Sequence, residues 1–131
     1  MGYDTIYVRE AGDAEIVSLS TSDDRIILTR DRQLTLRKGV RAFYISEILL
    51  ERQLRIVSDE FCLHFSEDSM RCGVCNGLLR IADRQAVKER VPDGVRERND
   101  LFYECVSCGH VYWRGTHWTK IKALIGRVEH A

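Results

Sequence analysis

The sequence has few features that would set it apart from ordinary globular proteins. It contains a single proline in 131 residues, which argues against a proline-rich linker between rigid domains. No apolar run approaches the roughly 20 residues of a membrane-spanning helix, and the first residues lack the basic-then-apolar pattern of a signal peptide. We therefore expect a cytoplasmic protein without a membrane partner, built as one domain or two very small ones.

The net charge of the whole chain is zero, but the charged residues are unevenly distributed along it. Residues 1–69 carry 9 Lys/Arg and 13 Asp/Glu, a net charge of −4, whereas residues 70–131 carry 11 and 7, a net charge of +4. An acidic half beside a basic half suits a carboxylate metal site next to a surface that holds a polyanion. Chance variation in composition explains the same difference, and the sequence leaves both explanations open.

The five cysteines, an odd number, do not indicate a disulfide framework. Four of them form two C-x-x-C motifs, Cys72/Cys75 and Cys105/Cys108, with 29 residues between the motifs. Each motif can turn two thiolates toward one ion, and four thiolates in a tetrahedron favour zinc. Such a closed site is structural rather than catalytic. The alternative is a redox-active C-x-x-C, which needs one pair at a helix start, so two pairs disfavour it.

A short apolar stretch follows each cysteine motif, and this is the layout of a zinc ribbon. We expect strands at residues 101–105 and 111–115 and a C-terminal helix at residues 117–130. The fifth cysteine, Cys62, lies in the apolar run "EFCLHF". It is interpreted as a small buried side chain rather than as a metal ligand.

The first 60 residues alternate between strand-like and helix-like runs, a pattern typical of a parallel sheet with crossover helices. Strands are expected at 5–8, 25–29 and 41–45, and helices at 13–20, 32–39 and 46–61. Three strands make only a small sheet, and such a sheet leaves much apolar surface uncovered.

An acid just past the end of a parallel strand stands where open α/β sheets place ligand-binding groups. Asp31 occupies this position after the strand "RIILT", and Asp13 begins the preceding helix. If the strands are neighbours, the two carboxylates converge and bind a hard divalent ion such as Mg²⁺ or Mn²⁺. The alternative is that each acid caps a helix, since Asp is a preferred N-cap residue.

Aromatic and cationic side chains gather after the second cysteine motif. They are Tyr112, Trp113, Arg114, His117 and Trp118. Aromatic rings that stack on bases, beside an arginine that meets phosphate, make a nucleic-acid-binding composition. The alternative is that the two tryptophans pack the ribbon, because large aromatics dominate small cores. Arg114 is the better candidate for a phosphate contact.

Seven segments in order resemble the Mut-seven C-terminal RNase domain family, and together they cover nearly the whole chain. They are "GYDTIYVRE" (2–10), "DAEI" (13–16), "RIILTRDRQL" (25–34), "GVRAFYI" (39–45), "CGVCNGLL" (72–79), "RVPDGV" (90–95) and "CVSCGHVYWRGTHW" (105–118). The ribbon segment ending in "YWRGTHW" is the most specific, whereas "LTRD" is shared with PIN-like domains broadly.

The resemblance implies a PIN-like nuclease fold joined to a zinc ribbon, which we expect at residues 1–66 and 67–131. It matches Asp31 to the metal-binding acid of a "TRD" motif and Asp13 to a second acid, so these two are the expected catalytic residues. It matches the four cysteines of the C-x-x-C motifs to zinc ligands. The implied activity is metal-dependent cleavage of RNA.

Two departures from the family pattern stand out. Family members carry a strand with the first metal-binding Asp and an Arg-rich helix before "GYDT", and this sequence begins at Met1 and Gly2. Gln33 stands where PIN-like domains often have a further acid. We therefore expect an N-terminally incomplete sheet, whose open edge invites a partner protein or a second copy of the chain.

The sequence thus supports two functions. The first is a ribonuclease, or the remnant of one, in which Asp13 and Asp31 hold Mg²⁺ or Mn²⁺ while Arg30, Arg32 and Arg114 meet the phosphate backbone. The second is a non-catalytic zinc ribbon that binds RNA or the ribosome.

Overall fold

The computed structural model describes residues 1–129 and divides them into two compact units. Residues 6–62 form one unit, which we call the α/β unit. Residues 1–5, together with the chain from residue 63 onward, form the other, which we call the cysteine unit. The predicted division at residues 66 and 67 stays a prediction, since compact packing alone does not define a domain.

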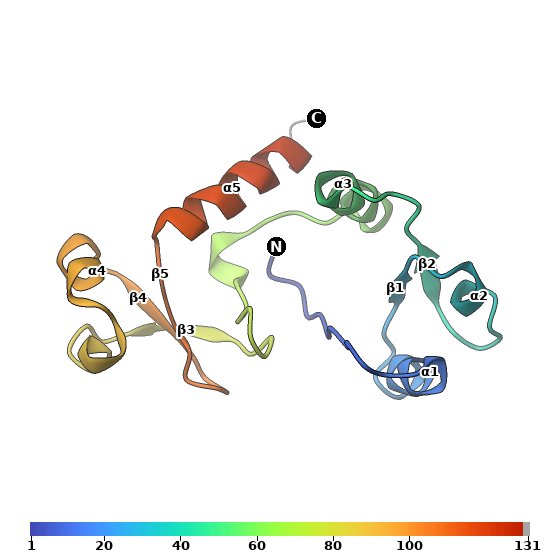
Figure 1. Ribbon diagram of the computed structural model, residues 1–131, viewed down its shortest axis with the longest axis horizontal. Coiled ribbons are helices and arrows are strands. Elements are labelled where there is room, and N and C mark those ends of the chain that lie inside the picture. Colours follow the sequence, from blue (N-terminus) through green and yellow to red (C-terminus); the bar gives the residue numbers. More distant parts are fainter. Residues whose placement is uncertain (130–131) are drawn as a thin grey trace. The chain divides into compact units, whose positions relative to one another are not determined.

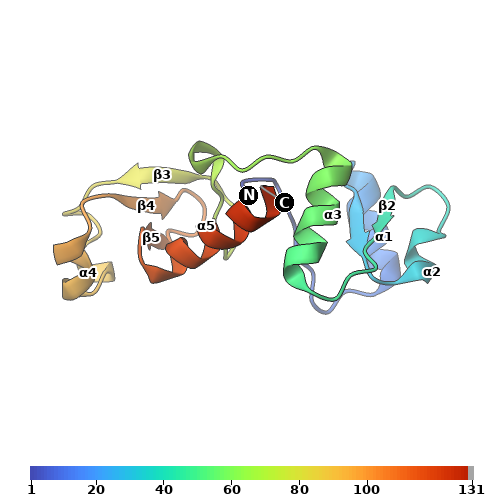
Figure 2. The same ribbon diagram turned by 90° about the horizontal axis from the view of Figure 1, so that it is seen from above.

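The α/β unit is built around two parallel strands joined by a crossover helix (Figure 1). Its elements are α1 (Asp13–Ser22), β1 (Ile27–Thr29), α2 (Arg32–Thr35), β2 (Ala42–Tyr44) and α3 (Leu50–Phe61). The strands pair in register, with Ile27 opposite Ala42 and Thr29 opposite Tyr44. Figure 2 shows β1 and β2 side by side, with helices around them.

Only a few apolar side chains among the described residues of this unit are buried. Ile27 of β1, Leu34 of α2 and Ile45 after β2 supply its buried apolar groups. The ring of Phe43 meets that of Phe61 edge-on, with 5.4 Å between centroids, so α3 packs against β2. The unit therefore depends on a small number of apolar contacts.

The prediction of a strand at residues 5–8 is wrong, because this segment forms no strand in the structure. Residues 1–5 belong to the cysteine unit, and the side chain of Tyr7 is 80% exposed. β-branched and aromatic residues favour a strand only where a neighbouring strand can pair with them. The expected three-stranded parallel sheet is therefore a two-stranded one.

Two of the expected helices are shorter than predicted. The helix expected at 46–61 begins at Leu50, after an extended Leu49, and the Gln53 side chain donates to the Glu47 carbonyl at 2.9 Å. This bond gives the Glu47 carbonyl a side-chain partner outside the helix. The helix expected at 32–39 ends at Thr35, and Gly39 has a positive φ of 79°.

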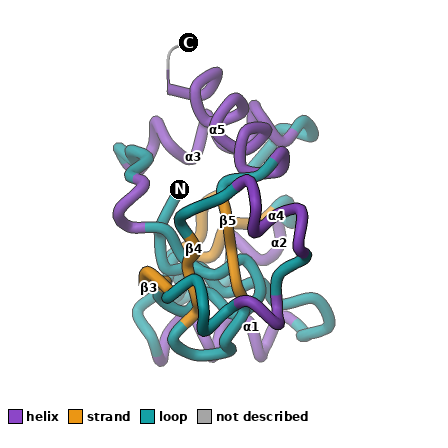
Figure 3. The backbone as a smooth tube through the Cα atoms, turned by 90° about the vertical axis from the view of Figure 1, so that its left-hand side faces the viewer, coloured by secondary structure: helices purple, strands orange, loops and turns teal. Residues whose placement is uncertain are grey.

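The cysteine unit contains an antiparallel sheet in the order β3–β4–β5, and Figure 3 shows how much of the backbone around the strands is loop. Its elements are the 3₁₀ turns Glu67–Ser69 and Lys88–Arg90, β3 (Leu79–Ala82), α4 (Asp93–Arg98), β4 (Phe102–Cys105), β5 (Val111–Trp113) and α5 (Thr116–Glu129). The expected C-terminal helix is confirmed, although its last predicted residue, His130, lies outside the described residues. With both sheets the chain is a mixed α/β protein.

The core of the cysteine unit surrounds Phe102, which is fully buried. Val87, Val91 and Val111 complete the buried cluster, and Trp113 packs against it. The ring of Trp118 lies 6.1 Å from that of Phe65. The packing interpretation of the two tryptophans therefore fits the structure.

The first five residues are fastened to the cysteine unit by hydrogen bonds. The Tyr3 hydroxyl donates to the His64 carbonyl at 3.1 Å and accepts from the His64 amide at 2.9 Å. The Asp4 carboxylate accepts from the side-chain amide of Asn76 and lies 4.0 Å from the Arg71 guanidinium. Residues from before and after the α/β unit thus build one structure. Among residues 1–129, no helix has the length and apolar character to cross a membrane.

Candidate metal centre and acidic strand end

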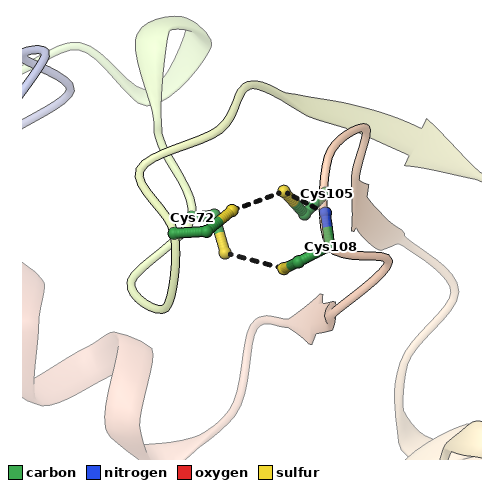
Figure 4. Close-up of side chains that lie close together, drawn as sticks. Cys72, Cys105 and Cys108 are labelled. Atoms are coloured by element: carbon green, nitrogen blue, oxygen red, sulfur yellow. Dashed lines mark hydrogen bonds between the residues drawn. The ribbon is translucent and has the colours of Figure 1, made fainter.

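The four cysteines of the two C-x-x-C motifs come together, as the sequence predicted. Their sulfur atoms all lie within 4.8 Å of one another. Figure 4 shows labelled cysteine side chains pointing toward one another from two separate loops. Within the described part of the chain, this is the one place where three or more Cys, His, Asp or Glu ligand atoms converge.

The two cysteine loops share one backbone geometry. Cys72 accepts at its carbonyl from the Asn76 amide, at 2.9 Å, and Cys105 accepts from the Gly109 amide, at 3.0 Å. In each loop the first cysteine sulfur also accepts from an amide two residues later, both at 3.4 Å. These amides stabilise thiolate charge, which metal binding requires.

Special backbone positions make these loops possible. Asn76 and Gly109, each four residues after the first cysteine of its motif, have positive φ values of 63° and 74°. Asparagine and glycine tolerate this left-handed region better than other residues. A Cβ added at Gly77 would come within 2.8 Å of the Cys105 sulfur, so only glycine fits there.

The sulfur spacing suits zinc. Sulfurs bound at about 2.3 Å to one tetrahedral ion lie about 3.8 Å apart. In the structure Cys72 and Cys108 are 3.6 Å apart, and Cys75 and Cys105 are 3.4 Å apart. Four thiolates at this spacing can hold one zinc ion with no open coordination position, which suits a structural ion.

The crowded thiols differ in acidity before any metal binds. Burial raises the pKa of Cys72, but hydrogen bonds from Tyr112 and from the amides of Cys75 and Val74 outweigh it and lower the pKa to about 6. A backbone hydrogen bond from His110 lowers the pKa of Cys108, yet the neighbouring thiols raise it to about 12. The thiols of Cys72 and Cys105, whose pKa values are both lowered, therefore ionise more readily than that of Cys108, whose proton a metal ion would displace.

Tyr112 of β5 supports this cluster. Its hydroxyl oxygen accepts a hydrogen bond from the Gly73 amide at 3.0 Å. The same oxygen lies 3.0 Å from the Cys72 sulfur. Burial, together with the bond to Cys72, raises the pKa of Tyr112 to about 12, so the hydroxyl keeps its proton as a donor. It thus orients the Cys72 sulfur, a role that outer groups commonly have at metal sites.

Replacing Tyr112 by phenylalanine should weaken zinc binding roughly 10- to 100-fold, the usual cost of losing such a group. Competition with a chelating dye measures the affinity. Tyr103→Phe is the matched control, because Tyr103 stands opposite Tyr112 on β4 and is also half-buried. Equal zinc affinity in both variants would remove Tyr112 from the metal site.

Asp31 lies at the carboxyl end of β1, where the parallel-strand pattern placed it. Its Oδ1 accepts from the Gln33 amide at 2.8 Å, so Asp31 is the N-cap of α2. Its own amide donates to the Thr29 hydroxyl at 3.0 Å. The capping role considered from the sequence is therefore present, and Oδ2 forms no hydrogen bond with the residues that the structure describes.

Asp13 stands in the first turn of α1, where Gly12 and not Asp13 is the N-cap. Its carboxylate pairs with the Arg37 guanidinium at 2.9 Å. Neither Asp13 nor Asp31 belongs to a converging group of three ligands among residues 1–129. Their assignment as catalytic residues stays a prediction.

The three arginines expected to meet phosphate lie in different surroundings. Arg30 is exposed. The guanidinium of Arg32 lies over the ring of Tyr44, 4.6 Å from its centroid, which holds it at the same strand end as Asp31. Arg114 pairs with Glu67 of the cysteine unit at 2.8 Å.

Cys62 corrects a prediction. It was expected to be buried, but it is exposed. It is the C-cap of α3 with a left-handed φ of 51°, and this conformation ends the helix at the surface. It takes no part in the cysteine cluster, in agreement with the sequence interpretation.

The family model of the Mut7-C RNAse domain matches residues 1–125. The chain belongs to this family, which suggests a nuclease-like function, and the resemblance seen in its motifs is confirmed. No curated protein and no solved structure shows a significant match.

Sequence reasoning missed two features of the metal centre. The sequence predicts Tyr112 to be part of a base-stacking aromatic group, and nothing in the motif spacing reveals its bond to Cys72. The left-handed conformation of Asn76 could have been predicted from the sequence. Asn76 stands four residues after the first cysteine of its motif, where the second motif has Gly109.

Proposed function

We propose that this protein is a metal-dependent ribonuclease of PIN-like fold, with a zinc ribbon that binds the same RNA. The observation that carries the proposal is the position of Asp31 at the carboxyl end of the parallel strand β1. Open α/β sheets bind their ligands at this end of the strands. Membership of the RNase domain family supports the same activity.

The side chains at this strand end suit a hydrated magnesium or manganese ion. Asp31 offers Oδ2, while its Oδ1 caps α2. Asp13 is the second acid that we propose, and it would exchange its ion pair with Arg37 for the metal. Mg²⁺ needs only one or two carboxylates, because it keeps several of its waters. Bound there, the ion supplies activation of water and neutralisation of charge on a phosphodiester.

The neighbouring arginines would position the RNA. Arg32 lies over Tyr44, the last residue of β2, so its cationic group is already held at this strand end before RNA arrives. Arg30 is exposed on the other side of Asp31 in the sequence. Both can bind phosphate oxygens, which fixes the backbone without reading its sequence.

Asp31→Asn should abolish metal-dependent cleavage of RNA, with a loss of at least about 100-fold, while leaving the fold intact. Asparagine caps helices as well as aspartate does, so α2 keeps its N-cap. The change therefore removes the charge that would bind the ion and little else. Cleavage of a labelled single-stranded RNA in Mg²⁺ or Mn²⁺ measures the effect.

Asp59→Asn is the matched control, because Asp59 is an exposed acid of α3 in the same unit. It should cleave as the unaltered protein does. Cleavage that survives Asp31→Asn, or that persists with the divalent ion removed, would exclude Asp31 as the metal-binding residue.

A second function is favoured by the contacts of the two acids. Asp31 caps α2 and Asp13 is paired with Arg37, so both carboxylates already have structural roles. In this function the protein is a non-catalytic zinc ribbon that binds RNA or the ribosome. RNA affinity would then fall steeply with salt and would be unchanged in Asp31→Asn.

Open sheet edges suggest a further partner. β1 and β2 pair only with each other among the described strands, and the side chain of Leu28 is 44% exposed. We propose that a strand from a second copy or another protein completes this sheet. Sedimentation of the purified protein as a monomer at all concentrations would exclude the second copy.

A further inference from the structure

An open cavity of about 500 Å³ lies in the cysteine unit, and none of its lining residues belongs to the cysteine cluster or to the acidic strand end. The end of α4, the turn after β5 and the first two turns of α5 line it. Its volume is in the range of small-ligand sites. Neither the family match nor the proposed catalytic site assigns a role to it.

Three of the lining residues are cationic, namely Arg98, Arg114 and Lys120. The lining contains no acidic residue. Arg98 and Lys120 are exposed and form no ion pair with any residue between 1 and 129. Two cations are therefore available to a ligand without breaking an existing contact, and a third stands beside them.

Arg114 has a partner, and this partner fixes its position. Its Nη2 donates to Glu67 Oε2 at 2.8 Å, and Lys122 binds the other oxygen of the same carboxylate. The hydrogen bond from Lys122, followed by the positive charges of Lys122 and Arg114, holds the pKa of Glu67 below its ordinary value. The guanidinium carries five N–H donors, so one bond to Glu67 leaves others for a ligand.

The polar groups around the cavity favour an oxyanion with several acceptor oxygens. Arginine donates in a planar fork that matches phosphate, and lysine adds a point charge. The hydroxyl of Thr116, the first residue of α5, adds a neutral donor to the lining. A phosphodiester needs donors of these kinds and no acid opposite them.

We propose that this cavity is a phosphate-binding site that holds the backbone of a single-stranded RNA. The inference rests on the proposed function for the identity of the ligand as RNA, and on Arg98, Arg114 and Lys120 for the phosphate chemistry. It gives the basic half of the chain a defined contact surface. None of the lining residues is a cysteine, so RNA bound there would leave the candidate zinc ligands free to hold their ion.

The test is binding of a short fluorescein-labelled single-stranded RNA to the zinc-loaded protein, measured by anisotropy across a salt series without Mg²⁺ or Mn²⁺. Arg98→Ala and Lys120→Ala should each weaken binding about 3- to 10-fold at low salt. Each should also reduce the slope of log K against log[salt] by about 0.7, the value for one phosphate contact to a single strand. In the double variant the slope of log K against log[salt] should fall by about 1.4.

Lys88→Ala is the matched control, because Lys88 is an exposed cation of the same unit outside the cavity. It removes the same charge and should leave the salt slope unchanged. Zinc content and helix content, measured on every variant, should equal those of the unaltered protein. An equal effect of Lys88→Ala and Lys120→Ala would overturn the site, because binding would then follow net charge alone.

The source of the phosphate is decided by competition. RNA that is displaced by an unlabelled strand, but by inorganic phosphate or a mononucleotide only at concentrations that act as salt, supports the proposal. Tight, Lys120-dependent binding of inorganic phosphate without RNA binding would overturn it in favour of a free anion.

The result is also separable from the nuclease proposal. RNA that binds through Arg98 and Lys120 but is not cleaved supports the cavity and contradicts catalysis. RNA that is cleaved with unchanged affinity in both variants supports catalysis and overturns the cavity.

Discussion

Removing zinc from the protein should unfold the cysteine unit and leave the α/β unit largely unaffected. Structural zinc sites of this type contribute on the order of 10–16 kcal/mol to folding. Apart from its cysteines, the described part of the unit buries only the small cluster around Phe102 and two apolar residues of α5, Ile125 and Val128. Its two cysteine loops approach each other closely, with Gly77 against the Cys105 sulfur. Without an ion, nothing would bind the four sulfurs to one another where the two loops meet, and ionised sulfurs would repel each other there.

Tryptophan fluorescence reports on this unit alone, because both tryptophans of the chain, Trp113 and Trp118, lie in it. A chelator titration should shift their emission to the red as Trp113 leaves the core. Readdition of zinc should restore the signal. Unchanged emission after the metal has been shown to be removed would contradict a structural role.

Two cysteine substitutions make the comparison specific. Cys105 is buried in the cluster, whereas Cys62 is exposed and lies outside it. Cys105→Ser should lose zinc and show the fluorescence of the metal-free protein. Cys62→Ser should keep about one zinc per chain, as a closed four-thiolate site requires. Stoichiometric zinc in Cys105→Ser would contradict the assigned ligand set.

Phe102→Ala is expected to have the second-largest effect, a loss of about 3–5 kcal/mol in the free energy of unfolding. Phe102 is fully buried and lies at the centre of the cluster formed by Val87, Val91 and Val111. Truncation removes its ring from that cluster and leaves a cavity. Urea unfolding of the protein with saturating zinc, followed by tryptophan fluorescence, measures the loss.

Leu78→Ala is the corresponding control, because the Leu78 side chain is 57% exposed in the same unit. It should change the free energy of unfolding by no more than about 0.5 kcal/mol. Since whole domains are stable by only about 5–15 kcal/mol, a loss of the expected size for Phe102 would be a large share. A loss below about 1 kcal/mol would show that the cluster is not the core.

The metal centre could be predicted almost completely from the sequence, because its chemistry is local. Two residues between cysteines set the distance between their sulfurs, and the spacing of Cys72 and Cys75 repeats in Cys105 and Cys108. The supporting hydroxyl of Tyr112 could not be predicted. It reaches Cys72 across 40 positions of sequence, and only the folded sheet brings the two together.

The α/β unit was predicted less well, because strands depend on partners. The crossover from β1 through α2 to β2 follows from alternating runs, and it is present. The expected strand at residues 5–8 has the same β-branched and aromatic composition, yet no strand forms there. Composition describes how well a residue fits a pleated surface, but it does not supply the neighbouring strand.

Asp31 shows why an acidic metal site is harder to predict from sequence than a cysteine site. A short acidic side chain after a strand and before a helix serves as a helix cap or as a metal ligand, and both need the same residue. The structure gives the cap through Gln33. The second role depends on which other carboxylates and waters join Asp31, and that arrangement is not a local property of the sequence.

The contact between Tyr3 and His64 has a consequence for the order in which the protein is made. The two hydrogen bonds between these residues join positions that are 61 residues apart. During synthesis on the ribosome, Met1 to Thr5 emerge before residue 63 but cannot dock until the chain beyond residue 62 has followed. The last cysteine, Cys108, emerges later still. The α/β unit can therefore fold while residues 1–5 have no partner, and these residues dock only after the chain beyond residue 62 has emerged.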